Sequence, residues 1–239
     1  MSLEIFITIL ITSIIQSLFG VGVLLFGTPL LLLFGFDFTT ILTILLPISI
    51  LINCFQLVSY YKTIDFVFYK KMLFYTIPFI VLFLFFVTST ELNINLLVGG
   101  FLILIALQKQ FPVLDGQIKK TMKFESIYLS LMGIVHGLTN LGGSLLTAII
   151  SNKKLSKDQT RSTIAICYLT FALFQIITLF FLTERSAVKF FDYTIYWLIG
   201  AGMFFLVENK LYKNIDENKY SKSFRVFLLG SGILLMVKS

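Results

Sequence analysis

Two clusters of glycines and neutral polar side chains are the parts of this sequence best suited to chemistry, because each interrupts a long apolar segment. The first cluster comprises Gln16, Ser17, Gly20, Gly22, Gly27, Thr28 and Pro29. The second comprises Gly133, His136, Gly137, Thr139, Asn140, Gly142, Gly143, Ser144 and Thr147. Each cluster predicts a helix break followed by a new helix N-terminus. Free backbone N–H groups and the positive end of a helix dipole at such a break suit the binding of an anion.

Seven residues of these clusters are the expected binding site, as backbone ligands, hydroxyl ligands or their polar neighbours: Gly22, Thr28, Gly142, Gly143, Ser144, Gln16 and His136. The alternative for the glycines is close helix packing, for which Gly133-x-x-x-Gly137 has the spacing. His136 is the only histidine. Since imidazole changes charge near neutral pH, His136 is either a proton partner of the site or a hydrogen-bonded structural group.

Other chemistries find little support in the residues. The 12 acidic residues all fall at the ends of apolar segments or between them, which argues against a carboxylate-driven proton pump or a buried cation site. No HExxH or Gly-x-Ser-x-Gly pattern indicates a protease or a serine hydrolase. Cys54 and Cys167 lie in apolar segments without a CxxC or histidine partner, so we expect no disulfide framework, no metal and no cofactor.

The elements that carry the two clusters must be membrane helices. Of 239 residues, 57% are apolar and only 13% are charged; Phe occurs 27 times, and the mean hydropathy is +0.94. A soluble domain of this size cannot bury so much apolar surface. The first residues lack a basic region, and no small-residue cleavage site follows, so we expect the first apolar stretch to be kept as a membrane segment. The chain is expected to be a multi-pass protein in the lipid bilayer.

Apolar runs are arranged in the same order in two halves. The first half has runs near 3–19, 23–35, 41–61, 72–88 and 94–108, and the second has runs near 124–139, 142–151, 162–183, 191–207 and 224–237. A polar stretch over 109–123, with Pro112, Asp115 and Gly116 as expected helix breakers, separates them. At an offset of 120 residues Gly22 falls on Gly142, and at 119 Phe55-Gln56 falls on Phe174-Gln175. We therefore expect a first repeat over 1–108, a cytoplasmic connecting loop over 109–123 and a second repeat over 124–239.

The basic residues predict how these repeats lie in the membrane. The stretches 62–71, 109–123, 152–161 and 208–225 hold 16 of the 19 Lys and Arg residues. Cytoplasmic loops are enriched in Lys and Arg, so the net charge of +7 is interpreted as a topology signal, and no nucleic-acid partner is expected. All four stretches can lie on the cytoplasmic side only if each short apolar run, near 23–35 and 142–151, returns the chain to the side of the membrane from which the preceding segment started. The expected fold is an all-α membrane bundle of two inverted-topology repeats, each with a broken or re-entrant short helix, about eight transmembrane helices in all.

The motifs resemble those of a known family. Gly20-Val-Gly-Val-Leu-Leu-Phe-Gly-Thr-Pro29-Leu30 looks like the first signature of the TauE/SafE sulfite-exporter family, and Gly133-x-x-x-Gly137-x-x-x-x-Gly142-Gly143-Ser144 resembles the second-half signature. The first glycine triplet is reduced here to Gly22 between Val21 and Val23, and the second ends in Ser144. The resemblance implies an inner-membrane transporter of small sulfur oxyanions, sulfonates or other organic anions.

The expected function is secondary transport of a small anion, by rocking of the two halves about a site at the middle of the membrane. A coupling proton or other ion and a homo-oligomer are compatible with the sequence. The competing interpretation is a non-transporting membrane scaffold or accessory subunit, in which the glycines serve only helix packing. A membrane enzyme is the third and weakest interpretation, because no nucleophile motif or deep carboxylate supports it.

Overall fold

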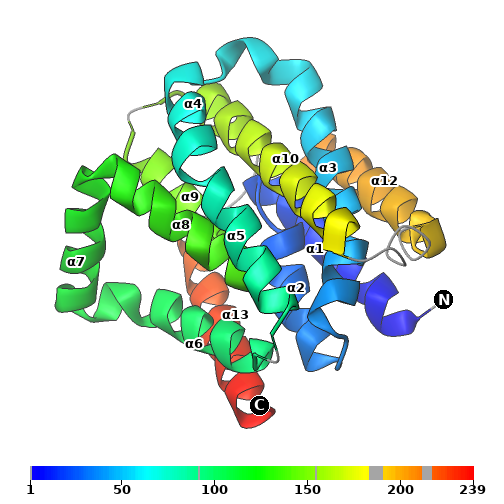
Figure 1. Ribbon diagram of the computed structural model, residues 1–239. Coiled ribbons are helices and arrows are strands. Elements are labelled where there is room, and N and C mark those ends of the chain that lie inside the picture. Colours follow the sequence, from blue (N-terminus) through cyan, green and yellow to red (C-terminus); the bar gives the residue numbers. More distant parts are fainter. Residues whose placement is uncertain (1, 91, 154, 183–190, 212–216) are drawn as a thin grey trace.

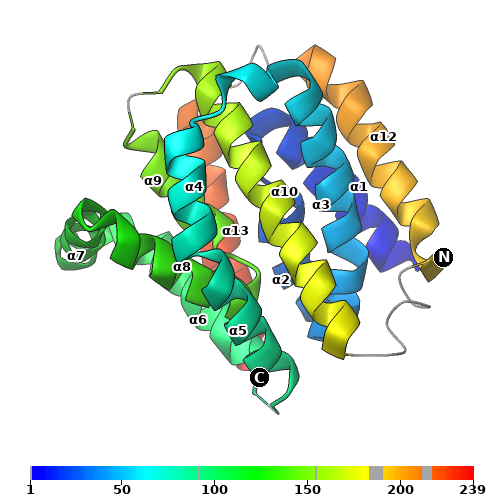
Figure 2. The ribbon, with the colours of Figure 1, turned by 45° about the horizontal axis from the view of Figure 1, so that its top comes forward.

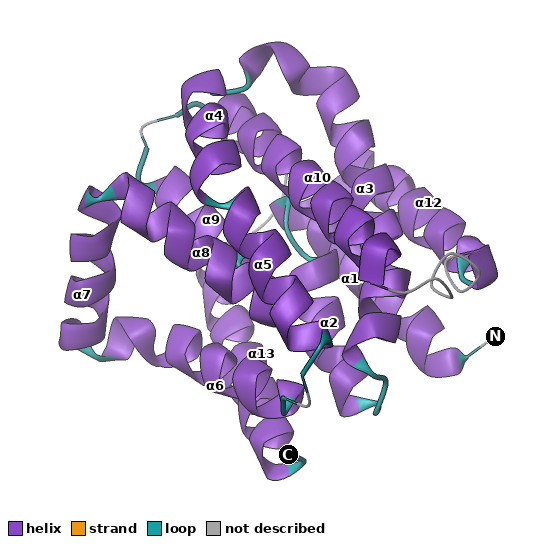
Figure 3. Cartoon of the chain, in the orientation of Figure 1, coloured by secondary structure: helices purple, strands orange, loops and turns teal. Residues whose placement is uncertain are grey.

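The computed structural model of the protein describes residues 2–90, 92–153, 155–182, 191–211 and 217–239. These residues fold into helices without any strand (Figure 3). The first half forms α1 (Leu3–Phe19), α2 (Val23–Leu33), α3 (Phe38–Tyr60), η1 (Tyr61–Thr63), α4 (Phe66–Tyr75), α5 (Ile77–Thr88), α6 (Ile94–Leu107) and η2 (Gln108–Gln110). The second half forms α7 (Pro112–Lys123), α8 (Glu125–Thr139), α9 (Gly143–Ser151), α10 (Lys157–Leu182), α12 (Thr194–Leu211) and α13 (Glu217–Val237). Every predicted apolar run is helical.

The connection between the halves differs from the expected loop, because α7 occupies most of it. Pro112 opens the helix at a position where its missing N–H costs no hydrogen bond. Asp115 pairs with Lys119 one turn later at 2.6 Å. The remaining breaker, Gly116, weakens a helix by only about 1 kcal/mol relative to alanine and does not stop it. Within the described residues α6 and α7 meet at a bend of 99°.

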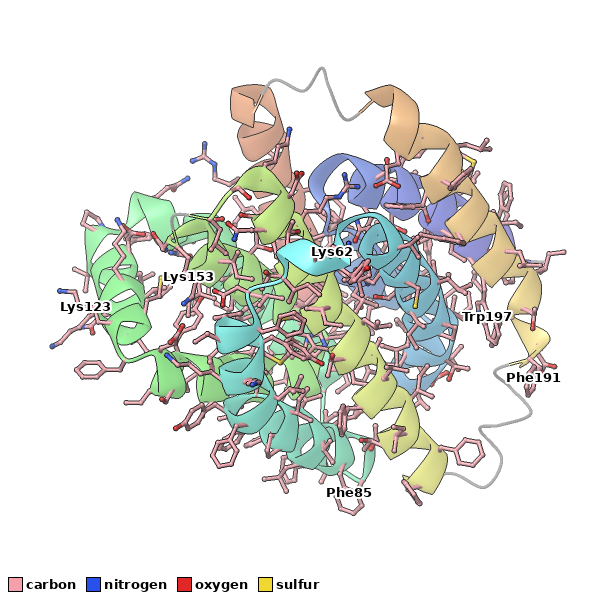
Figure 4. The ribbon with its side chains drawn as sticks, turned by 90° about the horizontal axis from the view of Figure 1, so that it is seen from above. Lys62, Phe85, Lys123, Lys153, Phe191 and Trp197 are labelled. Carbon is pink, nitrogen blue, oxygen red and sulfur yellow. The ribbon has the colours of Figure 1, made fainter. Side chains whose placement is uncertain are left out.

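Helix length and composition are those of a membrane protein. Three helices of the described chain are long and apolar enough to cross a bilayer: Phe38–Val58, Phe66–Thr88 and Lys157–Phe181. The second of these joins α4 and α5 through Thr76. A bent pair, α6 with α7, would be a fourth, and four apolar helices are shorter: Leu3–Ser17, Val23–Leu33, Thr194–Glu208 and Arg225–Val237. Large apolar side chains cover the outside of the bundle; Phe85 and Phe191, for example, lie at its rim in Figure 4.

The helices pack in a pattern that relates the two halves. Helix α3 packs on α10 at the centre of the bundle, and α6 packs on α13 (Figures 1 and 2). On one flank α1 packs on α12, and on the other α8 packs on α5. Helix α12 also contacts α3, as α5 contacts α10, and the short helices α2 and α9 touch each other. These contacts bring the start of α2 and the start of α9 into the interior.

The described parts of the four basic stretches lie next to one another at one end of the bundle. Lys71 and Lys153 both pair with Glu125, at 2.5 and 2.6 Å. The hydroxyl oxygens of Thr63 and Ser162 are 2.9 Å apart, and Arg161 pairs with Glu208 at the start of the fourth stretch. Figure 4 looks onto this end, where Lys62 and Lys153 are labelled. Lys238 lies elsewhere and donates to the carbonyl of Leu33, after which α2 ends.

One prediction concerns the α6–α13 crossing. A Cβ added to Gly99 would lie 2.9 Å from the carbonyl oxygen of Gly232, whereas one added to the neighbouring Gly100 would meet nothing within 4 Å. We expect Gly99→Ala to lower the thermal unfolding temperature of the purified protein, because overpacking costs about 1–3 kcal/mol. The matched Gly100→Ala should leave it unchanged or raise it. Equal unfolding temperatures for the two variants would contradict this packing.

Candidate functional site

The two predicted helix breaks have the same backbone construction. Helix α1 ends at Gly20, whose φ is 73° and whose N–H donates to the carbonyl of Gln16 at 2.8 Å. Helix α8 ends at Asn140, whose φ is 62° and whose N–H donates to the carbonyl of His136 at 2.8 Å. Glycine and asparagine are the residues that best tolerate this left-handed conformation. The chain therefore turns at both breaks by the same device, 120 residues apart.

Each short helix has as its N-cap a glycine that lies against the helix before it. A Cβ on Gly22 would be 2.6 Å from the backbone nitrogen of Gln16 and 2.8 Å from the carbonyl oxygen of Thr12. A Cβ on Gly142 would be 2.5 Å from Cβ of His136 and 2.9 Å from the carbonyl oxygen of Met132. In both cases the contacts are six and ten residues earlier in the chain. No larger residue fits at Gly22 or Gly142 without displacing backbone.

At the first break, the expected polar neighbour lies on the helix terminus itself. The side-chain oxygen of Gln16 accepts a hydrogen bond from the backbone N–H of Val23, the first residue of α2, at 2.8 Å. This amide oxygen therefore occupies a position that an anion's oxygen would take at a helix N-terminus. Thr28 lies further along α2 and is fully buried.

At the second break, a tyrosine covers the start of α9. A Cβ on Gly143 would lie only 1.3 Å from the hydroxyl oxygen of Tyr168, which comes from α10. The Ser144 hydroxyl donates back to the carbonyl of Leu141 at 3.0 Å. Gly142 and Gly143 are buried, while Ser144 is half-buried. The aromatic ring and the bent backbone close this helix start.

A chain of hydrogen bonds joins the two breaks. Nε2 of His136 lies 3.1 Å from Oε1 of Gln175. The Gln175 amide nitrogen donates to Oδ1 of Asn140 at 3.3 Å, and the Asn140 amide nitrogen donates to the Thr28 hydroxyl at 3.0 Å. All four residues are buried. The chain runs from α8 through α10 and the second break to α2, so it connects the two halves of the protein.

The structure thus brings Thr28 and His136 into one network and places Gln16, Gly22, Gly142 and Gly143 at the two helix starts. The site selected from the sequence lacks Asn140, Gln175 and Tyr168, although Asn140 belongs to the second polar cluster and Gln175 to the aligned Phe-Gln pair. The signal for Gln175 is its alignment with Gln56 at the offset of 119 residues. The signal for Asn140 is its place where Gly20 stands in the first half.

Gly133 and Gly137 have a different role from Gly142 and Gly143. A Cβ on Gly133 would lie 2.5 Å from the carbonyl oxygen of Thr76, and one on Gly137 would lie 2.8 Å from that of Ile80. Both contacts are to the α4–α5 helix pair. The packing interpretation is therefore correct for this Gly-x-x-x-Gly pair, whereas Gly142 and Gly143 lie at the helix break.

Nothing in the described part of the chain resembles a metal centre, since no group of three His, Cys, Asp or Glu residues lies close enough together. Cys54 is exposed and Cys167 is buried, and both are free thiols. A cavity of about 570 Å³ lies at the basic end, lined by Gln108, Asp115, Lys119, Met122, Ala148, Ser151 and Asn152. It contains none of the seven selected residues, which are packed against their neighbours in the interior.

Comparison with known proteins decides the family. The sequence model of one family, described as Sulfite exporter TauE/SafE, matches residues 5–235. The chain belongs to the sulfite exporter TauE/SafE family. The resemblance found in the glycine motifs is thereby confirmed, and TauE/SafE proteins are membrane transporters rather than enzymes. No curated protein and no solved structure matches the chain. Family and helix composition together make this TauE/SafE protein a multi-pass membrane protein.

Proposed function

We propose that this protein is a secondary transporter of a small anion, of the sulfite or sulfonate type, with its binding site between the starts of α2 and α9. The observation that carries the proposal is the hydrogen bond from Asn140 to Thr28, which joins a helix break of one half to the short helix of the other. In this proposal the two helix N-termini face one interior region and present N–H groups and positive dipole ends to the same anion. Gly22 and Gly142 let each helix start pack against the preceding helix, the Tyr168 hydroxyl fills the space beside Gly143 until the anion displaces it, and Thr28 and Ser144 supply hydroxyls.

The closed arrangement of the site fits an occluded or unloaded state. Gln16 holds the first N–H of α2, and Tyr168 covers Gly143. An anion would replace the Gln16 oxygen at Val23 and displace the Tyr168 ring. Broken helices whose half-helix N-termini point at an anionic substrate are a recurring arrangement in secondary transporters.

Alternating access in this proposal uses two inverted repeats of about four membrane-crossing elements each, eight in all. The packing pattern supports it. When each helix of the first half is exchanged for its counterpart in the second, the α1–α12 contact becomes α8–α5, and the α12–α3 contact becomes α5–α10. The α3–α10 and α6–α13 contacts map onto themselves. The common geometry of the two helix breaks supports the same symmetry.

The basic end of the bundle is the cytoplasmic side in this proposal, and the membrane is the inner, or cell, membrane. This orientation follows the positive-inside rule. It is supported by contacts that bring described parts of the stretches 62–71, 152–161 and 208–225 together: Lys71 and Lys153 with Glu125, Thr63 with Ser162, and Arg161 with Glu208. The connection containing α7 lies on the same side, because Glu125 follows it directly.

A scaffold without transport activity is the second candidate, and one observation favours it. The interior groups of the site are bonded largely to one another, as they would be if the glycines served only packing. Anion binding separates the two candidates, because only a transporter needs it.

Flux in proteoliposomes tests the proposal. The purified protein should release preloaded radiolabelled sulfite faster than protein-free liposomes, and an excess of unlabelled sulfite should slow the release of label. Taurine, thiosulfate and a small carboxylate, tested as competitors, define the substrate class. Release at the rate of protein-free liposomes for every one of these anions would contradict the proposal.

A further inference from the structure

The two ring nitrogens of His136 are in different situations. The side chain has no exposed surface. Nε2 lies 3.1 Å from Oε1 of Gln175, whereas no group of the described residues forms a hydrogen bond with Nδ1. A buried polar atom without a partner is uncommon and costs free energy, so Nδ1 calls for an explanation.

The amide orientations along the hydrogen-bond chain indicate which nitrogen carries the hydrogen. Gln175 donates through its amide nitrogen to Asn140, so the atom that it presents to His136 is its carbonyl oxygen. A carbonyl oxygen only accepts, and Nε2 of His136 is therefore the donor. A neutral imidazole has one N–H, which leaves Nδ1 as a lone pair able to take up a proton.

Nδ1 is close to the start of α9. Its neighbour in the ring, Cγ of His136, would lie 3.1 Å from a Cβ on Gly142, the N-cap residue of the short helix. The imidazole ring therefore rests against this helix terminus. The ring of Phe171 also packs against the imidazole, with the ring centroids 4.7 Å apart.

Other ionisable groups are either remote from the imidazole or neutral in character. Of the helices packed on α8, the segments α5, α6 and α9 carry no ionisable side chain. Helices α4 and α7 carry the charged residues Lys70, Lys71, Asp115, Lys119, Lys120 and Lys123, and Lys71 pairs with Glu125 at the start of α8. That end of α8 is about 16 Å from His136 along the helix, at 1.5 Å per residue. The two tyrosines of α4 are closer to the imidazole but are neutral near pH 7: the Tyr69 hydroxyl bonds Thr170 of α10, and Tyr75 precedes Thr76, which packs on Gly133. On α10 the nearby groups are Cys167 and Tyr168.

We propose that Nδ1 of His136 is the proton-binding atom of the transport cycle, so that the anion crosses the membrane together with a proton. This inference rests on the proposed transport function. The proton comes from the aqueous phase on one side, binds the Nδ1 lone pair, and leaves to the other side with the anion. An O–H bond of hydronium breaks as the N–H bond forms, the reverse occurs on release to water, and no covalent bond to the anion forms or breaks.

The physical reason for coupling is the cost of an isolated charge. An imidazolium alone in this interior is strongly disfavoured, as is an anion alone. Together at the start of α9 they neutralise each other, so each raises the affinity of the site for the other by the same factor. A monovalent anion then moves with one proton and no net charge. Because Gln175 and Asn140 link His136 to Thr28 by hydrogen bonds, protonation of the imidazole also affects the hydrogen bonding of Thr28 in the other half.

The first test uses the fact that the chain has a single histidine. Labelling with ¹⁵N-histidine gives the imidazole signals of His136 alone in bilayer-reconstituted wild-type protein by solid-state NMR. Methanesulfonate is the anion, because it does not titrate near neutral pH. Without it we expect the Nε2–H form with bare Nδ1. With saturating methanesulfonate the ring should carry both hydrogens at a higher pH than without it. A ring that keeps the same form in both conditions across about pH 5 to 8 would overturn the proposal.

The second test measures coupling. An inward proton gradient should raise methanesulfonate uptake by wild-type proteoliposomes several-fold, and it should have no effect in His136→Gln, whose amide can still donate to Gln175 but cannot take up a proton. Ser130→Ala, on the same helix with its hydroxyl bonded only to Ser126, is the control and should respond as wild type does. An unchanged gradient response in His136→Gln would overturn the inference while leaving the proposed transport intact. Absence of wild-type flux for methanesulfonate and for sulfite, taurine, thiosulfate and the carboxylate alike would instead refute transport itself and the coupling with it.

If His136→Gln does not fold, Gln175→Met tests whether the hydrogen bond to Gln175 fixes the Nε2–H tautomer of His136. Methionine removes the acceptor from Nε2, so the ¹⁵N spectrum should change from a single Nε2–H form to a mixture of the two neutral forms. A spectrum identical to that of the wild type would contradict the assigned tautomer.

Discussion

Replacing Gly143 with alanine is expected to reduce anion flux at least about tenfold, which corresponds to about 1.4 kcal/mol. The added Cβ would lie 1.3 Å from the hydroxyl oxygen of Tyr168 and 2.2 Å from Cζ. Tyr168 is only 2% exposed, so its ring can move only if neighbouring side chains move with it. The ring and the start of α9 must both move, and the site changes shape where the proposal has the anion bind. Flux into proteoliposomes, corrected for the amount of folded protein, is the measurement.

A double-mutant cycle separates the local clash from general destabilisation. Gly143→Ala should lower the unfolding temperature in the wild type but cost little in a Tyr168→Ala background, because the colliding ring is gone. Gly202→Ala, where a Cβ meets nothing within 4 Å, should match the wild type in both stability and flux. A folded Gly143→Ala protein with wild-type flux would contradict the assignment of this helix start to the site.

The second large effect is expected at Asn140. Asn140→Gly keeps the left-handed backbone conformation and removes the amide that links Gln175 to Thr28. Hydrogen bonds between membrane helices contribute about 0.6 kcal/mol on average, so the loss of stability should be small. The loss of flux should be at least about tenfold, because the link between the halves is broken. Both are measured on the same preparation, by thermal unfolding and by proteoliposome flux.

Gly20→Asn is the matched control for Asn140→Gly. It places asparagine at the equivalent position of the first half, where φ is 73° and a Cβ meets nothing within 4 Å. Asparagine tolerates this backbone conformation, so stability should change little. If Asn140→Gly lost several times the expected stability and kept its flux, Asn140 would be a structural residue and the link between the halves would have no role in transport.

The helix order and both helix breaks could be predicted because they depend on local sequence. Run length identifies the apolar helices, and the glycines mark where they end. The equivalence of Gly22 and Gly142 was visible as an offset of 120 residues, and the structure gives the two residues the same close contact with the preceding helix. Helix α7 was missed because proline and glycine were interpreted as breakers, although proline is favourable at a helix start.

The polar network could not be predicted because it depends on packing between distant segments. Thr28 and Asn140 are 112 residues apart, and His136 and Gln175 are 39 apart. Nothing in the sequence specifies that α10 turns Gln175 toward α8 rather than toward another helix. Its counterpart Gln56 illustrates the point, since it is equally buried but its amide has no hydrogen-bond partner in the described part of the chain.

The central claim is that one small anion binds between the starts of α2 and α9, and ligand-dependent thermal stabilisation tests it most directly. The measurement compares sulfite with chloride at equal ionic strength, for the wild type and for Asn140→Gly. A ligand at about 100 times its dissociation constant stabilises the folded protein by about 2.7 kcal/mol. We expect sulfite to raise the unfolding temperature of the wild type, chloride to leave it unchanged, and the increase to be much smaller in Asn140→Gly. Equal effects of sulfite and chloride, or an undiminished sulfite effect in Asn140→Gly, would contradict this claim.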